Sequence, residues 1–352
     1  MMGNMPRQAI VNITYIKKKK AGVKKKYASS VMAEYNEGFT YVDPASGESD
    51  TMDIKLTNTD MRWLNKWKPQ KGDKLTAEIV ERNWNKEGES KKFSCGKFCL
   101  DDLSYSGPEL VCSIGGLSVP EKNAFRSTDR NKTWRKVTIR IIATKIAKRY
   151  HLKLKYYGKK IKVGTIRQSG ESDSSFLKKV CEDYGMGLKV YYGKLILYDK
   201  GRFEKKAPIA TLAKADLQEW SYNSTISGTY TGAKIKYTSG RNGKTLKCKV
   251  GKGKRILNIN EKAESLREAR LKACAKVNLE NEKAETLTAT IMANNKIVAG
   301  STVTIKDLES VSGKYFVDKV THNIEAEGAY TMNLEMHKCQ KRITRAASLK
   351  VK

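Results

Sequence analysis

The sequence predicts a mainly β protein in which two similar β modules flank an α+β insert. Three observations lead to this fold class. Short alternating apolar segments, separated by Gly, Asp and Pro, fill the first third of the chain and its last part. Between them, apolar residues recur at helical spacing. The two β regions also contain similar stretches in the same order, which indicates a duplicated module.

The first β module is expected over residues 1–118. Its strand candidates are AIVNITYI, TMDIKL, LTAEIVERNW, KFSCGKFCLDDLSY and ELVCSIGGL. The lysine-rich stretch ITYIKKKKAGVKKKYASSVMAEY changes period at Ala21 and Gly22. We therefore predict two strands around a turn there, rather than the disordered arm that a basic block alone would suggest.

The insert, a region of helices and a hairpin, is expected over residues 119–204. The stretches VTIRIIATKIAKRY and SSFLKKVCEDYG carry apolar residues at helical spacing. LKVYYGKLILY then predicts a hairpin that turns near Gly193.

β character returns after the insert, and residues 205–255 are a candidate to complete the first module. The charged stretch NEKAESLREARLKACAKVNLENEKA predicts a connecting helix within 256–284, with Asn260 as its cap. The strands TLTATIM, STVTIKDL, GKYFVDKVTHNI and AYTMNLEM form the second β module, residues 285–340. Residues 341–352 are expected to be a loose basic tail.

The duplication is read from three pairs of stretches. GKFCLDDLSY, which starts at Gly96, lines up with GKYFVDKVTH, which starts at Gly313, and glycine, lysine and one aspartate are identical. Upstream, DTMDIKL parallels ETLTATI, and KGDKLTAEI parallels AGSTVTI. Short alternating strands also look alike by chance, and on these letters alone that alternative stays open.

The chain is strongly basic, with 69 Lys and Arg against 37 Asp and Glu and a net charge of +32. Nucleic acid, an anionic surface or an acidic protein are the partners that such a charge favours. Tyrosine pairs beside lysines, in KYYGKK and VYYGK, are typical of single-strand binding. However, Tyr191 and Tyr192 would point to opposite faces of a strand. No nucleic-acid-binding motif is apparent, so this function remains the alternative.

Cysteine content and hydropathy indicate assembly in the cytosol. The seven cysteines are an odd and scattered set, and no signal peptide is apparent, so free thiols in a reducing compartment are expected. No apolar run approaches the roughly 18 residues that a membrane-spanning helix needs, and no membrane partner is predicted.

Glu171 and Asp173 form the sharpest acidic pair in the chain. They are either a catalytic carboxylate pair or the start of a helix. Ser172 or Asp173 would cap that helix, acidic residues favour its first turn, and Gly185 suits its end. Polar and basic neighbours argue against the burial that a catalytic acid requires. We therefore expect a helix start.

No other segment predicts a catalytic, cofactor-binding or metal site, and an enzyme is not expected. None of the three histidines lies in a recognisable motif: His151, His322 and His337. Three cysteines could bind zinc, but no fourth ligand is apparent, so core thiols are favoured: Cys95, Cys99 and Cys112. VGKGKRIL lacks the spacing of a phosphate-binding loop.

From about Asp50 to His337 the chain resembles the late-control D-type hub proteins of contractile phage tails, which are related to the hub part of type VI secretion spikes. Four ordered stretches carry most of the resemblance: SDTMDIKLTNTDMRWLNKWKPQKGDKLTAEIVERNW, CGKFCLDDLSYSGPELVCSIGGLSVP, RQSGESDSSFLKKVCEDYGMGLKVYYGKLILYD and GKYFVDKVTHNIEAEGAYTMNLEM. The third is the most specific.

The resemblance implies a homotrimer in which each chain supplies two similar antiparallel β-barrels. Three chains would then present six modules to the six-fold tail tube and three-fold symmetry to the spike. The implied partners are the tail tube and spike proteins, with tape-measure and baseplate wedge proteins as further candidates. The protein would be assembled in the bacterial cytoplasm into a phage tail or tail-like particle. Because the chain ends soon after the second barrel, a separate spike polypeptide is expected.

Overall fold

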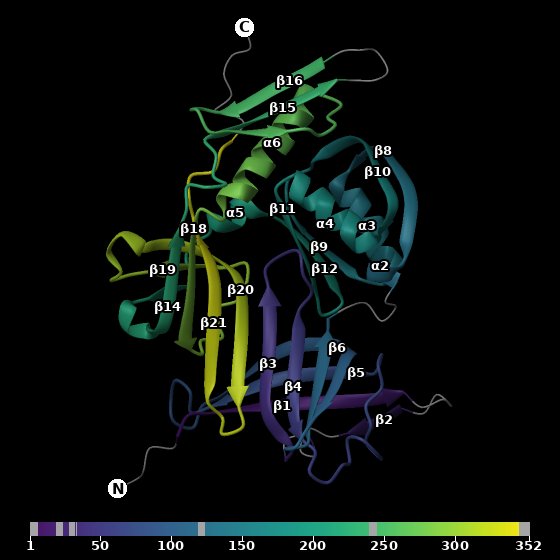
Figure 1. Ribbon diagram of the computed structural model, residues 1–352, viewed down its shortest axis with the longest axis vertical. Coiled ribbons are helices and arrows are strands. Elements are labelled where there is room, and N and C mark those ends of the chain that lie inside the picture. The colour runs from purple at the N-terminus through teal and green to yellow at the C-terminus, as the bar shows by residue number, and fades with distance from the viewer. Residues whose placement is uncertain are drawn as a thin grey trace.

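The computed structural model describes residues 6–18, 24–27, 32, 34–118, 124–238 and 245–344, and it confirms the mainly β fold class. Figure 1 shows an elongated molecule with β strands in its lower half and the insert above them. No helix among these residues is long and apolar enough to cross a bilayer.

The described residues of the first module form seven strands. They are β1 (Gln8–Lys18), β2 (Lys24–Tyr27), β3 (Asn36–Pro44), β4 (Thr51–Thr57), β5 (Lys74–Arg82), β6 (Ser90–Ser106) and β7 (Val111–Leu117). β1 and β2 pair antiparallel, which confirms the predicted hairpin, although its turn at Ala21 and Gly22 lies outside the described residues.

The second module contains six strands. They are β13 (Ala210–Leu212), β14 (Leu217–Ser224), β18 (Glu285–Met292), β19 (Thr302–Ile305), β20 (Gly313–Glu325) and β21 (Tyr330–Lys338). β13 pairs with β19 and β14 pairs with β18. The expectation that 205–255 completes the first module is therefore wrong for these two strands, which extend the second module.

One sheet runs through both modules, in the order β14-β18-β21-β20-β3-β4-β7-β6-β5-β1-β2, with β19 and β13 alongside β20. β20 joins them, because residues 313–316 pair with β19 whereas residues 319–325 pair with β3. Among the described residues, strand pairing closes neither module into a separate barrel. The modules form one continuous sheet instead, because β3 pairs with β20 across their boundary.

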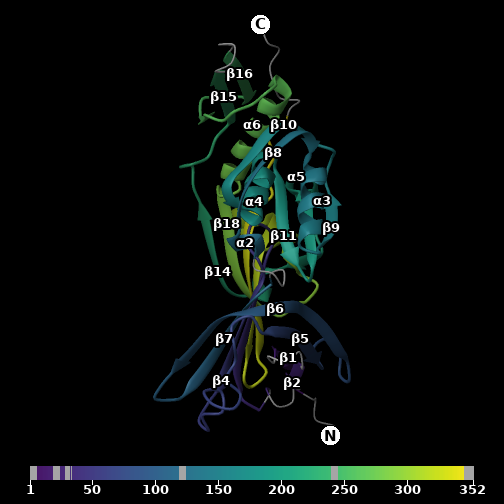
Figure 2. The ribbon, with the colours of Figure 1, turned by 90° about the vertical axis from the view of Figure 1, so that its right-hand side faces the viewer.

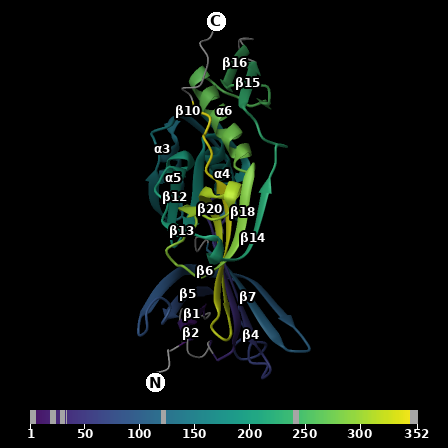
Figure 3. The ribbon, with the colours of Figure 1, turned by 90° about the vertical axis from the view of Figure 1, so that its left-hand side faces the viewer.

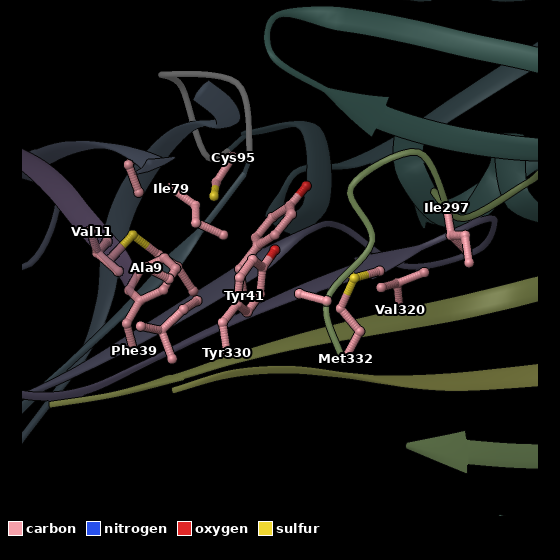
Figure 4. Packing of buried hydrophobic residues seen from close by; sticks show 14 of the residues in the cluster. Ala9, Val11, Phe39, Tyr41, Ile79, Cys95, Ile297, Val320, Tyr330 and Met332 are labelled. Atoms are coloured by element: carbon pink, nitrogen blue, oxygen red, sulfur yellow. The ribbon is translucent and has the colours of Figure 1, made fainter. Parts of the chain in front are cut away.

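Both modules contribute to one hydrophobic core. Figure 4 shows side chains of β1, β3, β5, β20 and β21 gathered in a single cluster. The Trp84 Nε1–H of the first module also donates to the Ala293 carbonyl of the second, at 2.8 Å. The junction is thus a buried core and not a flexible linker.

The insert packs helices against two small sheets. Its elements are α2 (Ala124–Ser127), β8 (Asp129–Thr138), α3 (Ile139–Arg149), β9 (Lys153–Tyr157), β10 (Lys162–Ser172), α4 (Asp173–Asp183), β11 (Met186–Tyr191), β12 (Lys194–Asp199) and α5 (Lys200–Glu204). The apolar stripes of α3 and α4 form its core. β11 and β12 pair across Gly193, which confirms the predicted hairpin.

A third unit lies at the far end of the molecule. It consists of β15 (Gly232–Thr238), β16 (Thr245–Gly251), β17 (Ile256–Ile259) and α6 (Leu266–Asn281). β16, β15 and β17 form a three-stranded sheet of their own under α6, so this part of 205–255 also lies outside the first module. Ser265, not Asn260, caps α6, because its side chain accepts from the Glu268 N–H at 3.1 Å.

Candidate assembly surface

The two modules repeat the same strand order, β4-β7-β6-β5 in the first and β18-β21-β20-β19 in the second. Their registers agree as well. Leu75 pairs with Phe98, and the positions aligned with them, Val303 and Tyr315, pair in the same way. An identical register through a whole module requires more than similar alternation.

The β-bulges agree too. The β6–β7 register shifts at Asp101, and the β20–β21 register shifts at Asp318, which is the aspartate shared by the two stretches. Equivalent hydrogen bonds support both bulges: Gly72 donates to the Leu100 carbonyl and Gly300 to the Val317 carbonyl, each at 2.8 Å. The chance explanation of the sequence similarity is therefore wrong, and the modules are copies of one unit.

The copies differ in what lies beside them. β3 pairs with β4 as β14 pairs with β18, so β3 and β14 are equivalent. The outer edge of β3 is covered by β20. The outer edge of β14 pairs with no strand of the described chain. β14 is also the more exposed of the two, and Figure 3 shows it at one side of the molecule.

Lys189 of β11 links the insert to the first module, and its partner Asp43 also contacts the second. Its ammonium contacts the Asp43 carboxylate, lies 3.4 Å from Asp50 Oδ1 and donates to the Pro44 carbonyl at 3.1 Å. Asp43 Oδ2 also accepts from the N–H of Ala299, which belongs to the second module. Sequence reasoning missed this buried cluster, because nothing around Lys189 distinguishes it from the many other lysines.

The acidic pair is a helix start, as predicted. Ser172 is the cap, accepting from the Ser175 N–H at 3.2 Å, and Gly185 follows the helix with φ +70°. Asp173 is fully buried, whereas Glu171 is half-buried at the end of β10. The two carboxylates thus lie in different environments, and the arrangement offers no acid–base pair.

Asp173 instead organises the polar centre of the insert. It accepts from Arg149 Nη1 at 2.5 Å, Tyr150 OH at 2.7 Å and Gln168 Nε2 at 2.9 Å, and Arg130 Nε lies 3.3 Å away. Burial opposes ionisation, but these hydrogen bonds and the Arg149 charge hold the pKa of Asp173 below its usual value. The carboxylate is a permanent anion with a structural role.

A second buried charge cluster ties the chain's end to the insert. Arg342 bridges Glu204 of α5 and Glu282 after α6, and His337 of β21 bonds Asp318 at 2.7 Å and Glu204 at 3.2 Å. Glu204, Glu282 and His337 offer atoms within 4.8 Å of one another, as metal ligands would. The Arg342 guanidinium and the Lys200 ammonium already form ion pairs with these two carboxylates. The expectation of a loose tail from residue 341 is wrong for Arg342.

This cluster makes stability depend on pH. Burial lowers the pKa of His337, but Asp318 and Glu204 outweigh it and raise the pKa to about 9. The native state therefore holds this proton more tightly than the unfolded chain. The resulting stabilisation is complete below about pH 6.5, amounts to about 3 kcal/mol, and is lost as pH rises through about 9.

Urea unfolding should show this loss of stability at high pH for the wild-type protein but not for His337→Gln. Equal pH dependence of the two proteins would contradict it.

The remaining candidate residues lie in different environments. Cys95 and Cys112 are buried in the hydrophobic core, and Cys99 is half-buried. Burial raises the pKa of Cys112 to about 12. His322 is fully buried with Nδ1 2.6 Å from Tyr330 OH, and burial lowers its pKa to about 3. His151 lies exposed in the turn after α3.

The tyrosine pairs do not act as units. Tyr191 is half-buried and donates to the Ser94 carbonyl at 3.0 Å, whereas Tyr192 is exposed beside Lys97. Tyr156 is likewise half-buried, and only Tyr157 of that pair is exposed. Nucleic-acid binding therefore gains no support from this geometry and stays an untested prediction.

Solved structures with a similar fold include tail proteins and a type VI secretion component. The 43 kDa tail protein of prophage MuSo2 from Shewanella oneidensis superposes with a TM-score of 0.69 at 15% identity, covering 94% of this chain and 98% of that one. A tail protein from Neisseria meningitidis gives 0.67 at 12% identity, with 94% and 97% covered. The chain has the phage tail protein fold. A type VI secretion component of E. coli, described as similar to phage T4 tail proteins, gives 0.56 at 11% identity, with 88% and 74% covered.

Sequence comparison agrees with the resemblance to hub proteins. The chain is 29% identical over 217 residues to the "Probable baseplate hub protein" of Escherichia phage 186, covering 60% of this chain and 53% of that protein. The protein of the same name from Escherichia phage P2 is 29% identical over 207 residues, with 56% and 50% covered. The chain thus matches about half the length of these curated relatives. A family model described as YQBQ-like matches residues 186–337.

Proposed function

We propose that this protein is a structural baseplate hub of a contractile phage tail or phage-tail-like particle, in which three copies join the six-fold tail tube to the three-fold spike. The duplication of the β module is the main observation that supports this proposal. Three copies of a chain with two equivalent modules present six similar surfaces, so a trimer can match a six-fold partner while the rest of the chain keeps three-fold symmetry.

The sequence relatives and the side-chain chemistry support the same role. The relatives bear the name of baseplate hub proteins. The buried carboxylates described above are engaged by arginine, lysine or histidine, as in a structural protein, so a non-enzymatic role is proposed. The tail tube and spike proteins are the proposed partners, with tape-measure and wedge proteins as further ones. The +32 charge would then face acidic surfaces of these neighbours.

Mass measurement tests this function directly. The purified protein is examined alone and with its spike partner, and we expect a trimer in at least the second sample. An obligate ring of this kind should bury more than about 2,000 Å² per interface. A strict monomer in both samples would contradict the proposal.

A further inference from the structure

The junction between the two modules within one chain is a template for the contact between chains. At this junction β3 of the first module lies along residues 319–325 of β20, with Phe39 opposite Ile324 and Tyr41 opposite His322. Each of these elements has an equivalent in the other module. β14 is equivalent to β3, and the second half of β6 is equivalent to the second half of β20.

Both equivalent elements have an open edge. β5 pairs with β6 only as far as Cys99, and no backbone hydrogen bond reaches the outer edge of residues 102–106 from the described parts of the chain. The outer edge of β14 is open in the same sense. Edges of this length are normally covered, because exposed N–H and C=O groups pair with other chains.

Side-chain burial also indicates that β14 contacts a second chain. Phe39 and Tyr41 are 2% and 1% exposed in the first module. The pairing of β3 with β4 and of β14 with β18 makes Trp220 equivalent to Phe39 and Tyr222 equivalent to Tyr41. Trp220 is 44% exposed, and Tyr222 is half-buried. An exposed tryptophan on a strand whose outer edge has no partner in the described chain is what an unoccupied copy of the junction should present.

We propose that β14 of one copy pairs antiparallel with residues 102–107 of β6 and its turn in a second copy, repeating the junction between β3 and β20. The equivalences fix the register: Trp220 lies opposite Gly107, Ser221 opposite Ser106 and Tyr222 opposite Tyr105. Junctions within a chain (β3 with β20) and junctions between chains (β14 with β6) then alternate around a ring. Each module contacts its neighbours in the same way.

The direction of the two edges suits a closed ring. Figures 2 and 3 show β14 and β7 toward the same side of the long axis, whereas Figure 1 shows β14 and β6 at opposite sides of the molecule. A head-to-tail contact of this kind closes when the rotation per copy divides a full turn. The inference takes the number of copies from the proposed function, whereas the strand pairing comes from the structure alone.

A disulfide tests the register. Ser106 and Ser221 are both exposed, and their internal equivalents, Asn323 and Thr40, contact each other at 3.3 Å. Side chains directly opposite on antiparallel strands lie about 4.5–5.5 Å apart, close to what a disulfide spans, whereas diagonal neighbours lie about 7–8 Å apart. Ser106→Cys with Ser221→Cys is therefore the test pair, and Ser104→Cys with Ser221→Cys is the matched control.

The two double variants are oxidised in the presence of the spike protein, and their masses are compared under non-reducing conditions. We expect a covalent trimer from the test pair and little cross-linking from the control. A trimer that forms without cross-linking, or equal cross-linking of both pairs, would overturn the strand pairing and leave the proposed function standing. A covalent ring with another number of copies would support the pairing and overturn the trimer. A monomer throughout would overturn both.

A second test compares the dissociation constants of two single variants and requires no disulfide. Trp220→Glu should raise the apparent dissociation constant of the assembly by at least about 30-fold, because a buried aromatic at the centre of a contact is lost. Ile141→Glu on α3 is the control, since Ile141 is also 44% exposed but lies far from either edge along the chain. Equal affinities of the two variants would contradict the assignment of Trp220 to the interface.

Discussion

Replacing Asp173 with alanine is expected to lower the free energy of unfolding by about 3 kcal/mol, because it removes the buried anion that Arg149 and Arg130 face. Tyr150 and Gln168 would lose their acceptor as well. Both arginines remain about one-third exposed, so water can partly replace the lost carboxylate. The expected loss in free energy of unfolding therefore lies at the lower end of the range for removing one partner of a buried ion pair.

Glu171→Ala is the matched control for this prediction. It removes a carboxylate two residues away that is only half-buried, so a change of less than about 1 kcal/mol is expected. Urea unfolding followed by circular dichroism measures both variants. Similar losses in the two variants would show that Asp173 is not the centre of the insert's polar network.

Replacing Lys189 with methionine is expected to cost about 3–5 kcal/mol and to loosen the insert from the β modules. Asp43 and Asp50 are 5% and 0% exposed, and methionine would leave both carboxylates buried without their cation. Lys249→Met on β16 is the control, because Lys249 is an exposed strand lysine, and there less than about 0.5 kcal/mol is expected.

A double variant separates loss of the ion pair from loss of packing. Adding Asp43→Asn to Lys189→Met removes one of the two unpaired charges, so the double variant should be more stable than the sum of the single effects predicts. Thermal unfolding and limited proteolysis of the insert report the two consequences. Strict additivity would mean that Lys189 acts through its hydrocarbon chain and not through its charge.

Local pattern predicted many of the strands and helices, although not β3, β8 or β10, and it indicated the duplication that the strand registers then established. The Gly96 and Gly313 stretches aligned correctly from letters alone, because a repeated module repeats its glycine, its bulge aspartate and its apolar alternation. The Ser172 region was predicted as a helix start because caps and first-turn acids act within a few residues. Asn260 was wrong for the same reason: Ser and Asn are comparable caps, and the local sequence does not choose between Asn260 and Ser265.

The sequence by itself thus determined a mainly β fold, a helix start at the acidic pair and a large positive charge, and it indicated a duplicated module. Tertiary structure alone decided that β13 and β14 belong to the second module, that β3 continues onto β20, and that Lys189 and His337 are buried among carboxylates. The physical reason is that alternation along a strand specifies which face is buried but not which strand lies beside it. Long-range pairing and desolvated charge depend on residues far apart in the chain, and no local signal marks them.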